Sequence, residues 1–241
     1  MCKLKSVIVM KDRVFCPEYD SHDKMLEELK IKDNEINARK LFVRVELSPT
    51  DGDIFSPVDS WNMNVDQDIK PDWFIESIDK ARVIDAVRAW AENHIYIGKN
   101  NFELKENGIY YLKNCKNVTA LGDSTVTAWG KSTVTARDNS TVDARDNSTV
   151  TACGNSTVIA RDKSTVTACD NSTVDAWDNS TVDAWGKSTV TARDSSTGII
   201  QNTPYAAKRE SFILMDNSTL KDCKTKTIYQ SGDWKFVSVE D

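Results

Sequence analysis

The side chains best suited to chemistry are carboxylates gathered in the first half of the chain. The stretch 66–74 reads DQDIKPDWF, and Asp51, Asp53 and Asp59 precede it. Mg²⁺ and Ca²⁺ prefer carboxylate oxygens as ligands, so a metal-dependent hydrolase is one interpretation of this segment. The spacing matches no EF-hand loop, however, and solvated acidic loops have the same composition. We therefore expect no metal here and keep the hydrolase as an alternative.

Histidine and cysteine give little further support for catalysis. The chain has two histidines, His22 and His94, and neither lies beside a serine or cysteine in a nucleophile motif. We expect His22 on the surface and His94 at the end of a helix. The nine glycines form no phosphate-binding loop, and the six cysteines lack the spacing of metal ligands. The sequence thus predicts a protein that is not an enzyme and needs no cofactor.

The dominant feature of the chain is an octapeptide repeated ten times from Ser124 to Thr197, the last copy imperfect. A typical unit reads Ser-Thr-Val-Thr-Ala, followed by three residues that include Gly, Asp or Asn. Successive strand residues point to opposite faces, so Ser, Val and Ala share one face and the threonines the other. The short strands, separated by turn formers, predict a β-solenoid with two octads in each coil. Gly198 stands where the tenth valine belongs, and we expect the regular tube to end there.

Coils of sixteen residues would stack equivalent positions about 4.8 Å apart. Outward threonines then form a lattice, and one edge has a column of tryptophan and arginine, ending at Arg193, that suits stacking of guanidinium on indole. Cys153 and Cys169 fall on adjacent coils at a separation that a disulfide allows, although nothing in the sequence demands one. The candidate binding residues are Thr125, Thr127, Thr133, Thr135, Thr149, Thr151, Thr165, Thr167, Trp129, Arg145, Arg161, Trp177 and Trp185.

The remaining sequence divides the chain into three parts. Residues 1–100 contain large apolar residues without a repeat, which predicts an α+β globular domain. Residues 101–198 are expected to form the β-solenoid with N-terminal capping strands, because the segment 95–123 approaches the octad phase with larger side chains. Residues 199–241 are expected to form a C-terminal cap, in which strand-like segments recur at 216–220 and 234–237.

Within residues 1–100, hydrophobic periodicity and capping signals predict five elements. Strands are expected at 6–10 and 41–47, and helices at 23–29, 33–40 and 77–94. Asp33 is the expected N-cap of the middle helix. The apolar face of the last helix would contain Ile78, Ala81, Ile84, Val87, Trp90 and Ala91.

Charge and hydropathy exclude several classes of function. The net charge is −6, and no region is basic enough to bind nucleic acid through its phosphates. No apolar run is long enough for a secretory signal or a membrane span, so we expect a cytoplasmic protein without a membrane partner. A flat solenoid face also leaves a symmetric homodimer open.

The octads of residues 117–197 resemble the Ser-Thr-Val repeat proteins of bacteriophages and gut bacteria, some of them labelled ice-structuring. They also resemble the Thr-X-Thr solenoids of insect antifreeze proteins, which implies ice binding as an alternative function. The second threonine of the unit departs from that pattern, because it is replaced by Asp143, Ile159, Asp175 and Asp183. Charged residues would interrupt an ordered lattice of hydroxyl groups.

Residues 1–100 are similar to phage-borne proteins, and this resemblance implies an intracellular binder of a host factor, including an inhibitor of a defence enzyme. The sequence contains no catalytic motif but predicts a regular surface of Thr, Asp, Arg and Trp. This combination also favours a binding protein. We therefore expect a non-catalytic binding or scaffold protein with a protein partner.

Overall fold

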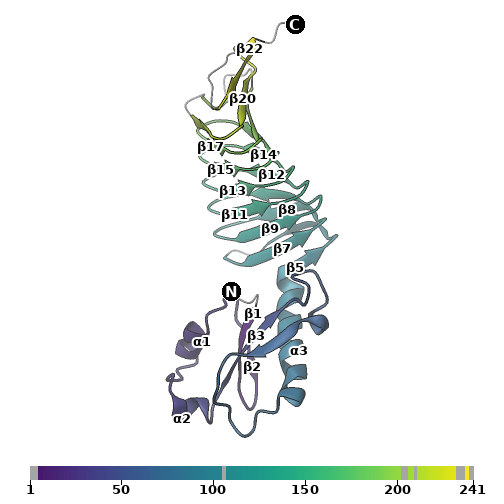
Figure 1. The fold of residues 1–241 in the computed structure, drawn as a ribbon, viewed down its shortest axis with the longest axis vertical. Coiled ribbons are helices and arrows are strands. Elements are labelled where there is room, and N and C mark those ends of the chain that lie inside the picture. The colour runs from purple at the N-terminus through teal and green to yellow at the C-terminus, as the bar shows by residue number, and fades with distance from the viewer. Residues whose placement is uncertain (1–4, 105–106, 202–205, 209–210, 232–236, 239–241) are drawn as a thin grey trace. The chain divides into compact units, whose positions relative to one another are not determined.

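The computed structural model describes residues 5–104, 107–201, 206–208, 211–231 and 237–238 (Figure 1). The chain forms two compact units, Met1–Ile95 and Tyr96–Asp241. The first is a small α+β unit and the second contains a β-solenoid, so the predicted fold class is confirmed.

The first unit is built on a four-stranded antiparallel sheet of order β2-β1-β3-β4. Its strands are β1 (Lys5–Val9), β2 (Val14–Phe15), β3 (Val43–Ser48) and β4 (Asn62–Val65). Its helices are α1 (His22–Glu28), α2 (Glu35–Ala38), the 3-10 turn η1 (Val58–Ser60) and α3 (Glu76–His94). The structure confirms the predicted strands 6–10 and 41–47 and the predicted helices 23–29 and 77–94. Each predicted end lies within two residues of the observed end. The short β2 and β4 show no clear strand pattern in the sequence.

Two local expectations in this unit are wrong. The N-cap of α2 is Asn34, whose side chain accepts a hydrogen bond from the backbone N–H of Asn37 at 2.9 Å. Asp33 instead pairs with Arg44 of β3. At the start of α3, Ile78 and Ala81 of the predicted apolar face are both exposed, Ile78 to 61%, because the buried positions belong to Asp79 and Val83. The side chain of Asp79 accepts a hydrogen bond at 2.9 Å from the backbone N–H of Ile75, the residue before the helix. This bond satisfies one of the free N–H groups at the start of α3.

The second unit contains two sheets that the chain enters alternately, over about six turns between residues 95 and 199 (Figure 1). The strands pair in parallel throughout the octads. The eight-stranded sheet contains β5 (Ile95–Ile97), β7 (Ile109–Lys113), β9 (Thr125–Trp129), β11 (Thr141–Ala144), β13 (Thr157–Ala160), β15 (Thr173–Ala176), β17 (Thr189–Ala192) and β19 (Phe212–Leu214). The ten-stranded sheet contains β6 (Asn100–Glu103), β8 (Lys116–Ala120), β10 (Thr133–Ala136), β12 (Thr149–Ala152), β14 (Thr165–Ala168), β16 (Thr181–Ala184), β18 (Thr197–Ile200), β20 (Thr219–Asp222), β21 (Thr227–Gln230) and β22 (Val237–Ser238).

The register of the sheets confirms two octads per coil. Val134 pairs with Val150, and Val142 pairs with Val158, so each residue faces the one sixteen positions away. The valines and alanines of the octads line the interior and are at most 3% exposed. The serine that opens each octad is also buried. A one-residue slip would turn every valine to solvent, so the register is strongly fixed.

The turns between strands place one residue of each octad in the left-handed region. Asp162, for example, has φ of 56°, a conformation that Asp tolerates better than most non-glycine residues. Its carboxylate accepts a hydrogen bond at 3.1 Å from the N–H of Asp146, the equivalent residue of the preceding coil. Gly154 occupies the same position in its own octad with φ of 70°. The repeated Gly or Asp therefore serves both the turn and the contact between coils.

The regular tube ends at Gly198, as expected, since its turns lie between residues 95 and 199. The sheets nevertheless gain further strands beyond this glycine. Strand β18, which contains this glycine, pairs in parallel with β16 on one side and β20 on the other. A β-carbon at Gly198 would lie 2.6 Å from a ring carbon of Phe212 and 3.1 Å from a methyl of Leu220. The missing side chain thus makes room for larger residues of the next coil. The predicted motif at 216–220 is confirmed in part by β20.

Both ends of the tube contain larger side chains than the repeats. At the first end, the rings of Tyr96 and Phe102 lie 4.8 Å apart between centroids, tilted by 57°, and pack against the core, as expected for a closing layer. At the other end, β21 and β22 add to the sheet in antiparallel fashion. The predicted strand 234–237 lies outside the described residues except for its last residue, Val237.

Candidate functional site

The outer face of the ten-stranded sheet presents two columns of threonine, which we call the threonine face. Its octads contribute Thr135, Thr151 and Thr167 to one column, as expected, and this column is interrupted at Asp183. Thr119 of β8 extends it by one further coil, a position that the sequence analysis did not include. The first threonines of the strands form the second column, which contains Thr133, Thr149, Thr165, Thr181, Thr197 and Thr219.

The outer face of the eight-stranded sheet is less regular. Its first column contains Thr125, Thr141, Thr157, Thr173 and Thr189. In its second column Thr127 is followed by Asp143, Ile159 and Asp175 before threonine returns at Thr191. The alternation expected from the sequence is thus present, and the second column has its longer unbroken run of threonines on the ten-stranded sheet.

One edge of the solenoid has the expected column of aromatic and cationic side chains, which we call the arginine edge. It contains Trp129, Arg145, Arg161, Trp177 and Arg193, one on each coil. The guanidinium of Arg145 lies 5.1 Å from the ring centroid of Trp129, and that of Arg193 lies 4.7 Å from that of Trp177. Arg145 and Arg193 therefore each stack on the tryptophan of the coil before, whereas Arg161 follows Arg145.

The aspartates that interrupt the threonine columns hold these arginines in place. Asp143 accepts hydrogen bonds from Arg145 of its own coil, at 2.7 and 3.0 Å, and from Nε of Arg161 on the next coil, at 3.2 Å. Asp175 likewise accepts a hydrogen bond from Nε of Arg193 at 2.9 Å. These are partly exposed pairs, each of which contributes up to about 1 kcal/mol. Their main effect is to fix the direction of three long side chains.

The opposite edge, which we call the cysteine edge, contains Arg137, Cys153, Cys169 and Trp185 on successive coils. Both cysteines are free thiols. Burial raises the pKa of Cys169 to about 11, and the neighbouring Cys153 adds to the shift. The predicted adjacency of the two cysteines is therefore confirmed. Trp185 lies here, away from the arginine edge, and is half-buried beside Ala206 of the returning chain.

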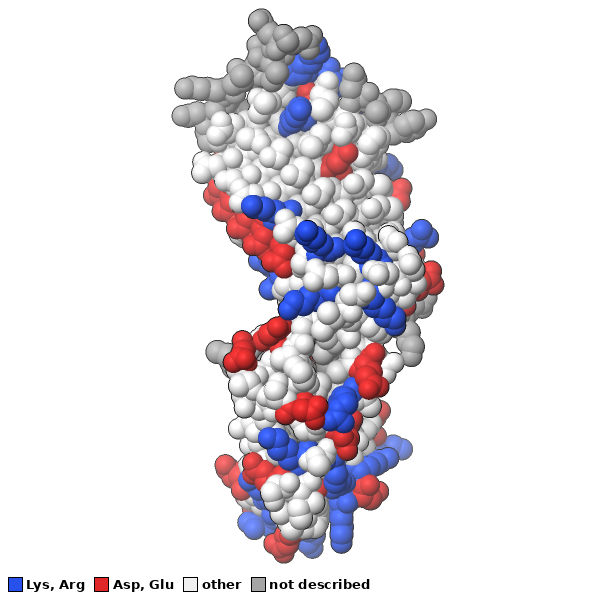
Figure 2. Space-filling model, turned by 90° about the vertical axis from the view of Figure 1, so that its right-hand side faces the viewer, with Lys and Arg blue, Asp and Glu red and all other residues white. Residues whose placement is uncertain are grey.

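A row of acidic side chains runs next to the arginine edge. The left-handed turn residues on this side are Asp146, Asp162, Asp178, Asp194 and Asp216, and each carboxylate accepts a backbone N–H of the coil before. Figure 2 shows acidic side chains in such a row on the solenoid, with Lys and Arg beside it. On the cysteine edge the same position alternates between Gly and Asp. One edge of the solenoid therefore presents parallel rows of opposite charge.

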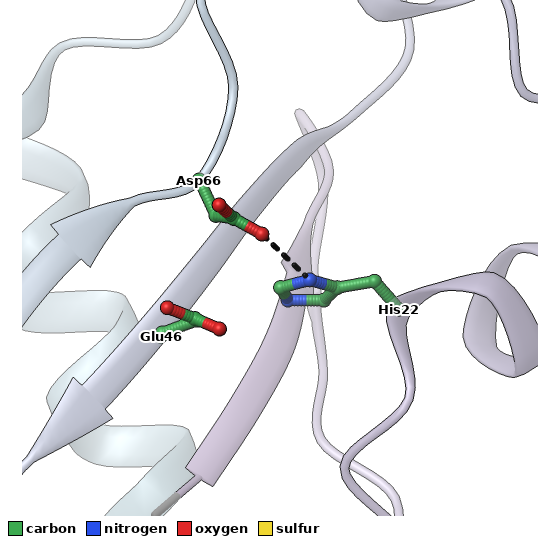
Figure 3. A group of neighbouring side chains, drawn as sticks. All are labelled: His22, Glu46 and Asp66. Carbon is green, nitrogen blue, oxygen red and sulfur yellow. Dashed lines mark ion pairs between the residues drawn. The ribbon is translucent and has the colours of Figure 1, made fainter. Parts of the chain in front are cut away.

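The carboxylates that the alternative of a metal-dependent hydrolase would require in the first unit are not brought together as a group. Asp59 pairs with Arg88 of α3 at 2.6 Å, and Asp53 accepts a hydrogen bond from the N–H of Phe55. Asp66 alone joins a cluster of possible metal ligands, and its companions there are His22 and Glu46 (Figure 3). No motif in the sequence indicates this group, since its members are at least twenty residues apart.

The expected position of His94 is confirmed, whereas that of His22 is not. His22 is not a surface residue, because its side chain is 10% exposed. His94 does end α3, as expected, but its ring is buried, stacks on Trp90 at 4.8 Å and lies 2.6 Å from a carboxylate oxygen of Glu18.

Comparison with known proteins finds no matching protein family, no matching curated protein and no matching solved structure. Among the described residues, the helices are all too short or too polar to cross a bilayer. No relative therefore indicates the function, which we infer from the surfaces of the chain itself.

Proposed function

We propose that the protein is a non-catalytic binding protein that holds a protein partner on the arginine edge of its solenoid. The observation that carries this proposal is the fixed geometry of Arg145, Arg161 and Arg193, which are stacked or hydrogen-bonded on a β-sheet framework. Tryptophan and arginine are the residues most enriched where protein interfaces gain their binding energy.

The fixed arginines lower the cost of association. A free arginine side chain loses up to about 2 kcal/mol of rotamer entropy when it is immobilised. Here much of that cost is met during folding, since each guanidinium already has an indole or a carboxylate partner. The adjacent row of aspartates adds charge of the opposite sign, which favours a partner with a complementary pattern of charges. More specifically, we propose that the partner is an intracellular factor of a host and that binding of this protein inhibits its activity.

Affinity capture with matched variants tests this proposal. The double variant Trp177→Ala, Arg193→Gln removes one stacked pair of the arginine edge, whereas Thr135→Ser, Thr151→Ser alters the threonine face only. We expect a partner that is retained by the wild type and the threonine variant but lost by the edge variant. A partner retained equally by all three proteins, or no specific partner in any lysate, contradicts the proposal. Circular dichroism confirms that each variant is folded.

The threonine face supports ice binding as a second candidate. Alternate residues of a strand lie about 6.7 Å apart and neighbouring strands about 4.8 Å apart, so the two columns form a flat array of hydroxyl groups. The wild type should then inhibit ice recrystallisation, and Thr151→Lys at the centre of the face should abolish the effect. Thr191→Lys on the other sheet is the control and should retain it. Unchanged ice growth with the wild type at high concentration rules this function out.

A further inference from the structure

His22, Glu46 and Asp66 converge in the first unit from three separate elements (Figure 3). His22 begins α1, Glu46 belongs to β3, and Asp66 follows β4 directly. One potential ligand atom from each residue lies within 4.8 Å of those of the other two. Nδ1 of His22 lies 3.5 Å from a carboxylate oxygen of Asp66.

The imidazole of His22 is held in one orientation. Its Nε2 lies 3.2 Å from the backbone carbonyl oxygen of Val45, which can only accept a hydrogen bond. The proton of a neutral ring therefore resides on Nε2, and Nδ1 presents its lone pair towards the carboxylates. A hydrogen bond from the second ring nitrogen to a backbone carbonyl is the usual support of a metal-binding histidine. The ring is also nine-tenths buried, which restricts its rotation.

The two carboxylates are attached to backbone that the sheet holds firmly. In β3 the residues Val43, Val45 and Leu47 point into the core, so Glu46 points to the opposite face. Its backbone is paired on both sides, with Ser6 of β1 and Asn64 of β4. The N–H of Asp66 donates to the carbonyl of Arg44 at 2.9 Å, which continues the β3–β4 pairing. The distances between the ligand atoms can therefore change through movement of the side chains, without movement of the backbone.

We propose that His22, Glu46 and Asp66 bind a divalent transition-metal ion, with Zn²⁺ as the representative member of the class. One imidazole nitrogen with two carboxylate oxygens suits Zn²⁺ or Mn²⁺ better than Mg²⁺, which prefers oxygen ligands and retains several waters. Ligand atoms around a tetrahedral Zn²⁺ lie about 3.4 Å apart, so the group closes by roughly 1 Å when the ion enters. Three protein ligands leave a coordination position for water or for a ligand of the ion.

Nuclear magnetic resonance of the untagged protein tests the site, because the chain has two histidines and the second serves as an internal control. Titration with Zn²⁺ should shift or broaden the ring signals of His22 in a saturable, one-to-one manner. The ring signals of His94 should not change. Mg²⁺ at the same concentration should leave both histidines unaffected. Changes at both rings, or none at His22, overturn the proposal without the need for any variant.

Calorimetry of variants supplies the second measurement. His22→Gln and Asp66→Asn should each lower the affinity for Zn²⁺ at least about tenfold, since each removes a ligand. Asp68→Asn alters an exposed carboxylate of the same segment outside the group and should bind Zn²⁺ as the wild type does. Equal affinity in all four proteins contradicts the site. Binding of a partner at the solenoid is measured separately, so the two proposals can fail independently.

Discussion

Asp175 accepts a hydrogen bond from Nε of Arg193, eighteen residues further along the chain, at 2.9 Å. The same relationship joins Asp143 to Arg161 at 3.2 Å and Asp183 to Gln201 at 2.8 Å. A residue at the second outward position of a strand therefore contacts the edge residue of the following coil. The aspartates that interrupt the threonine columns thus each hold a cationic or amide side chain at an edge of the solenoid.

The pair of Asp175 and Arg193 should contribute little to stability. The two side chains are 34% and 28% exposed, so solvent screens their attraction. A double-mutant cycle of Asp175→Asn and Arg193→Gln should give a coupling free energy of about 0.2–1 kcal/mol by chemical denaturation. A coupling well above about 2 kcal/mol would mean that the pair supports the fold rather than the shape of the edge.

The aspartates in the left-handed turns should be more sensitive. Asp162→Ala loses the hydrogen bond from Asp146 and places a β-carbon without a polar group at φ of 56°. We expect a cost of about 1–2 kcal/mol, since an unpaired N–H adds to the unfavourable conformation. Asp162→Asn is the matched control, because asparagine tolerates this conformation and can still accept the hydrogen bond. Equal unfolding free energies for the two variants argue against the contact between coils.

The buried serines offer a comparison within one structural position. Oγ of Ser148 donates to the carbonyl of Ala128 at 3.0 Å, whereas Oγ of Ser156 has no hydrogen-bond partner among the described residues. Ser148→Ala should therefore lower the unfolding free energy by about 1 kcal/mol, and Ser156→Ala should be neutral or stabilising. Thermal denaturation of the two variants measures the difference. The opposite order is incompatible with this placement of the hydroxyl groups.

Cys169 should react slowly with alkylating agents. Its pKa is raised from 9.0 to about 11, first by burial and then by the neighbouring Cys153, and only the thiolate is a good nucleophile. At pH 9 about 1% of this thiol is ionised, compared with about half of a thiol with the ordinary value. Cys153→Ser removes the charge of the second thiolate, so the pKa of Cys169 should fall and its labelling should accelerate. Mass spectrometry of iodoacetamide adducts against time gives both rates, and labelling of wild-type Cys169 as fast as a small exposed thiol contradicts the placement.

The architecture of the solenoid could be predicted because its cause is local. Val and Ala alternate with Thr in every octad, and this alternation fixes the inside, the outside and the sixteen-residue spacing that brings Cys153 next to Cys169. The contacts of Asp143 and Asp175 with arginines could not be predicted, because they depend on side-chain directions at the edge. The end of the regular tube at Gly198 could be predicted. The packing beyond it could not, because the ring that approaches Gly198, that of Phe212, comes from a segment outside the repeat.

The first unit shows where the sequence contains less information. Helix α3 and strand β3 have regular hydrophobic periods and were predictable, but Ile78 is exposed because Asp79 caps the helix from a buried position. The group of His22, Glu46 and Asp66 depends on how a helix start, a strand and a strand end meet in three dimensions. The spacing of these residues along the chain does not indicate that they lie close together.

The inward and outward assignment of the octads is the claim on which both proposed surfaces depend. Val158 and Ile159 are neighbours in β13, and the first is 0% exposed while the second faces outward. We predict that Val158→Ala lowers the unfolding free energy of the solenoid by about 2 kcal/mol, because it leaves a cavity in a packed interior. Ile159→Ala, which removes more carbon atoms, should cost less than about 1 kcal/mol. Equal costs, or a larger cost for Ile159→Ala, in chemical denaturation followed by circular dichroism would contradict the account.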